Sequence, residues 1–179
     1  MLPNIAWQIL NKNKIKNTQH ATRHIVWTVI FWIYCSLAAY EAGIGTVWDI
    51  ISYKEIVGGI NLTPLSVNPR FTQILNIYMF VPFGFLLPHI WQRFRNPLRV
   101  LLTGFGFSLL IEALQLFNHR ISDIDDLIMN TIGTCIGYLI WAFLWLIFLR
   151  KRKTSAEFSK NEPIIYILLG ILGVFFLFN

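Results

Sequence analysis

Five long apolar runs dominate the sequence and limit the chain to one class of fold. Each run approaches the roughly 20 residues that an α-helix needs to cross the ~30 Å hydrocarbon core of a bilayer. Hydrophobic residues make up 55% of the 179 residues and charged residues only 13%, which is too little charge for the surface of a water-soluble domain. We therefore predict an all-α, polytopic membrane helix bundle with about five transmembrane helices, at residues 25–43, 74–91, 100–117, 127–149 and 164–178.

Positive charges divide the segments between the runs into two sets. Twelve of the 15 lysines and arginines lie before the first run, between the second and third, and between the fourth and fifth. Cytoplasmic segments carry such an excess, so we predict the N-terminus inside and the C-terminus outside. The predicted organisation is a basic cytosolic segment (1–24), a four-helix membrane domain (25–149) with an external loop (44–73), a basic cytosolic linker (150–163) and a fifth hydrophobic helix (164–178).

The net charge of +6 does not indicate a nucleic-acid-binding protein. Once the spans are assigned, the basic residues are divided among separate connections and leave no basic surface. Cys35 and Cys135 lie in the middle of different apolar runs, where we expect packing residues rather than a disulfide. The first run continues past its small residues, so we expect an uncleaved helix rather than a signal peptide.

Four polar residues interrupt the apolar runs near the predicted outer face. Glu112 lies five residues before the end of the third run, which is roughly 8 Å below the outer boundary, and Gln115 follows one turn later. Asn76 and Asn130 lie at a similar depth in the second and fourth runs. Such residues often only join helices by hydrogen bonds, but an unpaired carboxylate in hydrocarbon is costly. Glu112 is therefore the strongest indication of a functional site.

The short segment between the third and fourth runs adds charged residues at the same level. Arg120 is the natural partner for Glu112, with the start of the fourth helix as the alternative contact. Asp123, Asp126 and Asn130 are spaced by three and four residues, which places them on one face of a helix. Asp123 is also positioned to cap that helix.

Gly133 and Gly137 continue the same face as a GxxxG pattern. Small residues at this spacing let a neighbouring helix approach closely. The connection to the third span is short, and helices joined by short connections are usually neighbours. We therefore predict that the third and fourth spans form an antiparallel hairpin with these two glycines at the contact.

Three motifs occur in order along the four-helix domain. The first is Asn76 followed by Phe-Val-Pro-Phe-Gly at 80–84, the second is Glu112-x-x-Gln115, and the third runs from Arg120 to Gly137. Together they resemble the motifs of the VanZ-like membrane proteins, over residues 25–149. The resemblance implies a role in the bacterial cell envelope, since the family's namesake is linked to low-level resistance to teicoplanin, a lipid-bearing glycopeptide. It implies no particular reaction.

Two hypotheses for the function remain open, and we favour the non-enzymatic one. In it, the chain binds an amphiphile at the outer leaflet of the bacterial cytoplasmic membrane, either a lipoglycopeptide antibiotic or a lipid-linked cell-wall precursor, without a cofactor. Its candidate binding residues are Asn76, Glu112, Gln115, Arg120, Asp123, Asp126 and Asn130. The alternative is a membrane enzyme in which a divalent cation held by Glu112, Asp123 and Asp126 acts on a phosphorylated lipid headgroup. A transporter ranks third, because one polar layer near one face gives no path across the bilayer.

Overall fold

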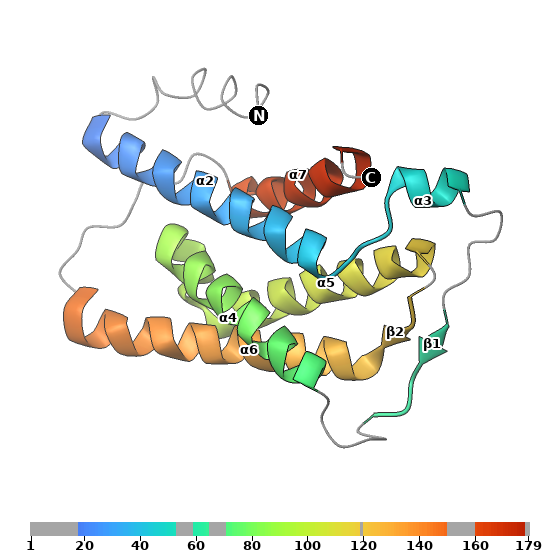
Figure 1. Cartoon of the computed structure of the whole chain (residues 1–179). Helices are drawn as coiled ribbons and strands as arrows, with labels where there is room; N and C mark the ends of the chain where they lie inside the picture. Colours follow the sequence, from blue (N-terminus) through green and yellow to red (C-terminus); the bar gives the residue numbers. More distant parts are fainter. Residues whose placement is uncertain (1–17, 53–58, 65–70, 119, 150–159, 178–179) are drawn as a thin grey trace.

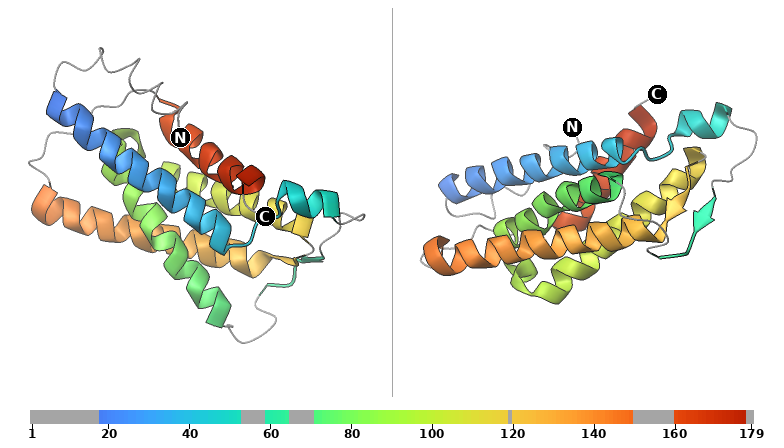
Figure 2. Two further views of the ribbon diagram at one scale, coloured as in Figure 1. Left: turned by 45° about the horizontal axis from the view of Figure 1, so that its top comes forward. Right: turned by 60° about the horizontal axis from the view of Figure 1, so that its bottom comes forward.

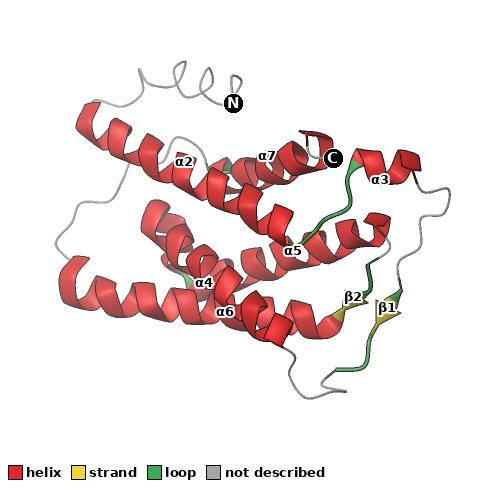
Figure 3. Ribbon diagram, in the orientation of Figure 1, coloured by secondary structure: helices red, strands yellow, loops and turns green. Residues whose placement is uncertain are grey.

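The computed structural model describes residues 18–52, 59–64, 71–118, 120–149 and 160–177 (Figure 1). Within these ranges the chain is almost entirely helical (Figure 3), which confirms the all-α class. The α-helices are α2 (Thr18–Glu41), α3 (Val47–Ser52), α4 (Phe71–Ile90), α5 (Pro97–Gln115), α6 (Ile124–Leu144) and α7 (Glu162–Leu177). Two 3₁₀ turns, Gln92–Arg95 and Leu116–Asn118, flank α5, and a π-helical turn, Trp145–Leu149, extends α6.

Four of the described helices, α2, α4, α5 and α6, are long and apolar enough to cross a membrane. Figures 1 and 2 show α2 and α6 running along the molecule, with α4 crossing α6 obliquely. Helix α7 is also apolar, but its 16 residues extend only about 24 Å, less than the ~30 Å hydrocarbon core. The fifth span and the orientation of the bundle therefore stay predictions.

Local sequence signals explain where two of the long helices begin. Asn96 caps α5 by accepting a hydrogen bond from the backbone N of Leu98 at 2.9 Å, and Pro97 occupies the first helical position. Asp123 caps α6 by accepting from the backbone N of Asp125 at 3.0 Å, as predicted. Both caps satisfy backbone donors that the first turn of a helix leaves unpaired.

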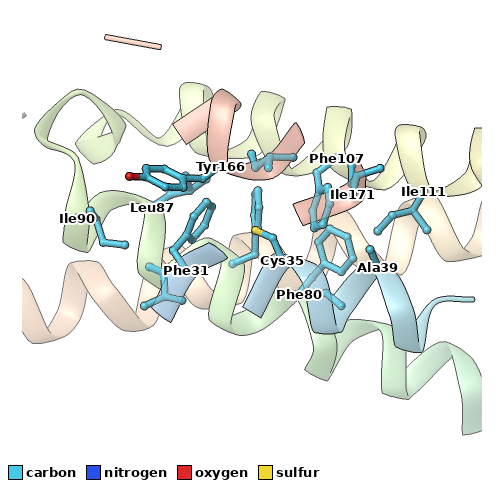
Figure 4. Packing of buried hydrophobic residues seen from close by; sticks show 14 of the residues in the cluster. Phe31, Cys35, Ala39, Phe80, Leu87, Ile90, Phe107, Ile111, Tyr166 and Ile171 are labelled. Atoms are coloured by element: carbon cyan, nitrogen blue, oxygen red, sulfur yellow. The ribbon is translucent and has the colours of Figure 1, made fainter. Parts of the chain in front are cut away.

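Helix α4 lies at the centre of the bundle and contacts α2, α5 and α6. On the side of α2, α5 and α7 it packs into a core of aromatic and aliphatic side chains, seen in Figure 4. The rings of Phe83 and Phe107 stack with centroids 5.0 Å apart, and Phe31 meets Trp91 edge to face at 5.1 Å. Cys35 is fully buried in this core, where Gly170 of α7 lets α2 approach.

The glycines of α6 contact α4, so the prediction that they contact the third span is wrong. A Cβ atom added at Gly133 would lie 2.3 Å from the carbonyl O of Ile77, and one at Gly137 would lie 2.0 Å from that of Val81. Gly84 of α4 is equally close to Thr134. The predicted neighbours α5 and α6 do contact each other, but through Gly104, against which the side chain of Thr134 packs.

The external loop is tied to the connection between α5 and α6. Its strand β1 (Ile60–Asn61) pairs in parallel with β2 (Ser122–Asp123), and the backbone N of Ser122 donates to Gly59 at 2.9 Å. Helix α3 lies at the same end of the bundle (Figure 1). The described parts of the loop thereby lie at the end of the bundle where the predicted site residues are found.

Candidate functional site

The polar residues at this end of the bundle surround a pocket of about 530 Å³. The pocket lies between the C-terminal ends of α2 and α5, the first half of α4 and the start of α6. Its walls combine charged and amide side chains with apolar ones. The lining residues are Glu41, Ala42, Leu75, Asn76, Tyr78, Met79, Ile111, Glu112, Gln115, Arg120, Asp126 and Asn130.

Six of the seven residues proposed from the sequence line this pocket. The exception is Asp123, which caps α6 and whose other carboxylate oxygen accepts from the amide of Asn61 at 3.3 Å. Four helices contribute to the lining, so residues up to 89 positions apart in the sequence, Glu41 and Asn130, meet here. The structure brings these side chains together, while their role in binding stays a prediction.

Glu112 faces the bundle interior and is only 5% exposed. Its Oε2 accepts hydrogen bonds from the hydroxyl of Ser122 at 2.8 Å and from the backbone N of Asp123 at 3.1 Å. The predicted contact with the start of the fourth helix is therefore confirmed. These two donors stabilise a carboxylate that would otherwise be costly at this depth.

Arg120 does not pair with Glu112 and instead binds the C-terminus of α2. Its Nη1 donates to the carbonyl O of Ala42 at 2.7 Å, and its guanidinium lies over Gly43, whose φ of +66° ends the helix. Gln115 donates to the same carbonyl at 2.7 Å. A cation at a helix C-terminus is favoured by the exposed carbonyls and the helix dipole. This explains why Arg120 binds the end of α2 rather than Glu112.

The remaining lining residues join α4, α5 and α6. The amide of Asn76 in α4 and the guanidinium of Arg120 both interact favourably with the carboxylate of Asp126. Asn130 donates from Nδ2 to the hydroxyl of Ser108 at 2.9 Å. Each polar side chain therefore holds two elements together and lines the pocket as well.

Comparison with known proteins identifies the family. A family model described as VanZ/LLP1 matches residues 25–149, more than two thirds of the chain. The chain belongs to the VanZ/LLP1 family. The matched residues include the whole pocket, while α7 lies outside them. A search of curated proteins and a search of solved structures each found no match. Four membrane-capable helices and this membership make the chain a multi-pass membrane protein.

Sequence reasoning missed one buried polar pair in this VanZ/LLP1 domain. Asp125 is 3% exposed and accepts from the amide of Gln73, itself 7% exposed, at 3.0 Å. The bond ties the start of α4 to the start of α6 beside the pocket. Asp125 lies between Asp123 and Asp126, both of which were proposed as site residues. Polar and apolar residues alternate in this loop, and that pattern gives no reason to expect a buried carboxylate. Gln73 stands just before the second apolar run, where a polar residue is unremarkable.

The described residues also bear on the proposed three-acid metal site. Among them, no group of three His, Cys, Asp or Glu side chains is arranged to hold a metal ion. Asp123 faces Asn61 and the start of α6, and Glu112 accepts hydrogen bonds from Ser122 and the backbone. The acids thus pair with donors of the protein rather than converging on one point.

Proposed function

We propose that this VanZ/LLP1 family protein binds an amphiphile in the pocket, at the outer leaflet of the bacterial cytoplasmic membrane. The ligand is a lipoglycopeptide antibiotic or a lipid-linked cell-wall precursor, and its capture contributes to teicoplanin-type glycopeptide resistance. The observation that carries the proposal is a pocket with buried polar side chains on one wall and exposed, mainly apolar side chains of α4 at its edge.

An amphiphile needs a polar surface for its headgroup and an apolar surface for its tail, and the pocket offers both. Glu112, Gln115 and Asn130 are each at least nine-tenths buried, whereas Leu75 and Tyr78 on the α4 side of the pocket are 47% and 69% exposed. On a helix that spans a membrane, exposed apolar side chains face acyl chains. A headgroup among the buried polar residues would thus have its tail beside α4, in the surrounding lipid.

The distribution of basic residues supports an outer location for the pocket. Arg93 donates to the carbonyl O of Lys160, so the turn after α4 lies beside the residues that immediately precede α7. Both belong to the basic set that the positive-inside rule assigns to the cytosol. The pocket lies at the opposite ends of α4 and α5, which supports a position in the outer leaflet.

Drug susceptibility of a strain that lacks the gene tests the proposal. The strain is complemented with the parent protein, with Glu112→Gln and with Asn76→Ala, at equal amounts in the membrane. Thr131→Val is the matched control, because the Thr131 hydroxyl donates to the carbonyl O of Leu127 in its own helix and the residue is not among those that line the pocket. Teicoplanin is compared with a glycopeptide that has no lipid tail.

We expect the parent and Thr131→Val to raise tolerance of teicoplanin and the two pocket variants to lose that gain. Tolerance of the tail-less drug should not change. Equal tolerance with and without the parent protein would refute the role in resistance. Full activity of both pocket variants would refute the assignment of that role to the pocket.

A further inference from the structure

The buried wall of the pocket presents hydrogen-bond acceptors that lack donors. Gln115 is 7% exposed and Asn130 only 2%, and both line the pocket. Among the described residues, neither Gln115 Oε1 nor Asn130 Oδ1 has a hydrogen-bond partner. A buried acceptor without a donor is energetically unfavourable, so two such atoms on one pocket wall point to a ligand that supplies donors.

The contact of Gln115 determines the orientation of its amide, and Asn130 has the same arrangement in the structure. Gln115 Nε2 donates to the carbonyl O of Ala42 at 2.7 Å, and because a carbonyl can only accept, the oxygen end must be the other one. Asn130 Nδ2 donates to Ser108 at 2.9 Å. In both residues the nitrogen joins helices, and the oxygen has no hydrogen-bond donor among the described residues.

The charges that line the pocket also favour a ligand that donates hydrogen bonds over an anionic one. Three carboxylates line it, those of Glu41, Glu112 and Asp126, against one cation, that of Arg120. Arg120 is exposed at the rim and already binds the end of α2. An anion placed against the buried wall would meet carboxylates and amide oxygens, whereas a cation or a hydroxyl would be attracted to them.

We infer that the buried wall of this pocket takes a headgroup that donates hydrogen bonds, such as the hydroxyls of a sugar or polyol or an ammonium group, and rejects an anionic one. The inference rests on the proposed function and narrows its ligand. For a glycolipid-type ligand that also carries phosphate, the sugar or amine contacts Gln115 and Asn130, and the phosphate stays at the rim near Arg120.

Three probes with the same dodecyl tail separate the possible headgroups. The full-length protein is placed in phosphatidylcholine nanodiscs with dodecyl glucoside, dodecylamine or dodecyl phosphate at equal mole fraction, and native mass spectrometry measures the bound probe. We expect the glucoside or the amine to bind at least about tenfold more tightly than the phosphate, and the tighter of the two identifies the donor as hydroxyl or ammonium. Preferential binding of the phosphate would overturn the inference but leave the proposed function standing. Binding of none of the probes would overturn both.

Two substitutions at Asn130 test which atom recognises the headgroup. Asn130→Leu removes the acceptor and should weaken the donor probes roughly threefold to tenfold. Asn130→Asp keeps an acceptor, which Ser108 can join by turning its hydroxyl, and should bind these probes as well as the parent or better. Thr131→Val should match the parent with every probe. An anion site would give the opposite result, with Asn130→Asp the weaker variant, and that outcome would refute the inference.

Discussion

Gly137→Ala is expected to destabilise the protein, although alanine is the better helix former. A Cβ atom at this position would lie 2.0 Å from the carbonyl O of Val81 and 2.9 Å from the backbone N of Phe85. An ordinary contact begins at 3.4 Å, so α4 and α6 would have to separate by about 1.4 Å there. Because backbone atoms cannot turn aside as a side chain can, we expect the cost of overpacking, about 1–3 kcal/mol.

Thermal unfolding of the purified protein measures this cost. For a chain of this size, a loss of 1–3 kcal/mol corresponds to a decrease in Tm of about 2–12 °C. Gly106→Ala is the matched control, because the same methyl group on α5 has no atom within 4 Å. The control should keep or raise the Tm, since alanine is favoured over glycine in a helix by up to about 1 kcal/mol.

Gly84→Ala tests the same contact from α4, because its Cβ would lie 2.0 Å from the carbonyl O of Thr134. It should lower the Tm as Gly137→Ala does. If both variants were as stable as Gly106→Ala, the close approach of α4 and α6 would not limit stability, and the reasoning from the glycines would fail.

Four further outcomes are expected. Glu112→Ala should lower stability by about 1–3 kcal/mol, because it leaves two donors without their acceptor, whereas Glu112→Gln should unfold at nearly the parent Tm. Gly43→Ala should lower the Tm, because the residue has a φ of +66° and its methyl group would lie 2.8 Å from a guanidinium carbon; an unchanged Tm would show that the end of α2 adapts. Glu162→Ala removes the carboxylate that bonds a buried histidine and a buried indole and should lower stability by about 1–3 kcal/mol, measured by the same unfolding assay. Single cysteines at Thr63 and Lys160, in a cysteine-free background, should react with an impermeant reagent only outside and only inside, respectively, and the reverse pattern would refute the predicted orientation.

The helices of the bundle were predictable because the bilayer restricts the chain so strongly. A run of apolar residues of sufficient length in hydrocarbon can only be helical, and each predicted run lies largely within a described helix. The same reasoning selected the pocket residues. A polar side chain within such a run must find a partner in the bundle, and Asn76, Glu112 and Asn130 all turn toward other helices.

The partners of the α6 glycines and of Arg120 were not predictable from the sequence. The predictions chose partners that are close in sequence, whereas the actual partners are distant. A GxxxG pattern states that some helix approaches closely, and the short connection favoured α5. Helix α4 has a small residue of its own, Gly84, at the contact with α6. Small residues of α4 and α6 therefore face each other. Similarly, Arg120 and Glu112 have opposite charges and lie close in sequence, but the carbonyls at the end of α2, 78 residues from Arg120, bind the guanidinium.

The pocket side chains also show why structural and functional roles are hard to separate in a membrane bundle. The same residue serves both roles through different atoms. Gln115 uses Nε2 to hold the end of α2, and Asn130 uses Nδ2 to hold α5, while Oε1 and Oδ1 have no donor among the described residues. Deleting either side chain removes both atoms at once, so lost activity alone would not distinguish a broken bundle from a lost ligand contact. Substitutions that change one atom keep the size of the side chain and alter its charge. Asn130→Asp adds a negative charge, and Ser108 can restore the contact with α5 by turning its hydroxyl, whereas Glu112→Gln removes a negative charge. The function of this family is best tested with such substitutions.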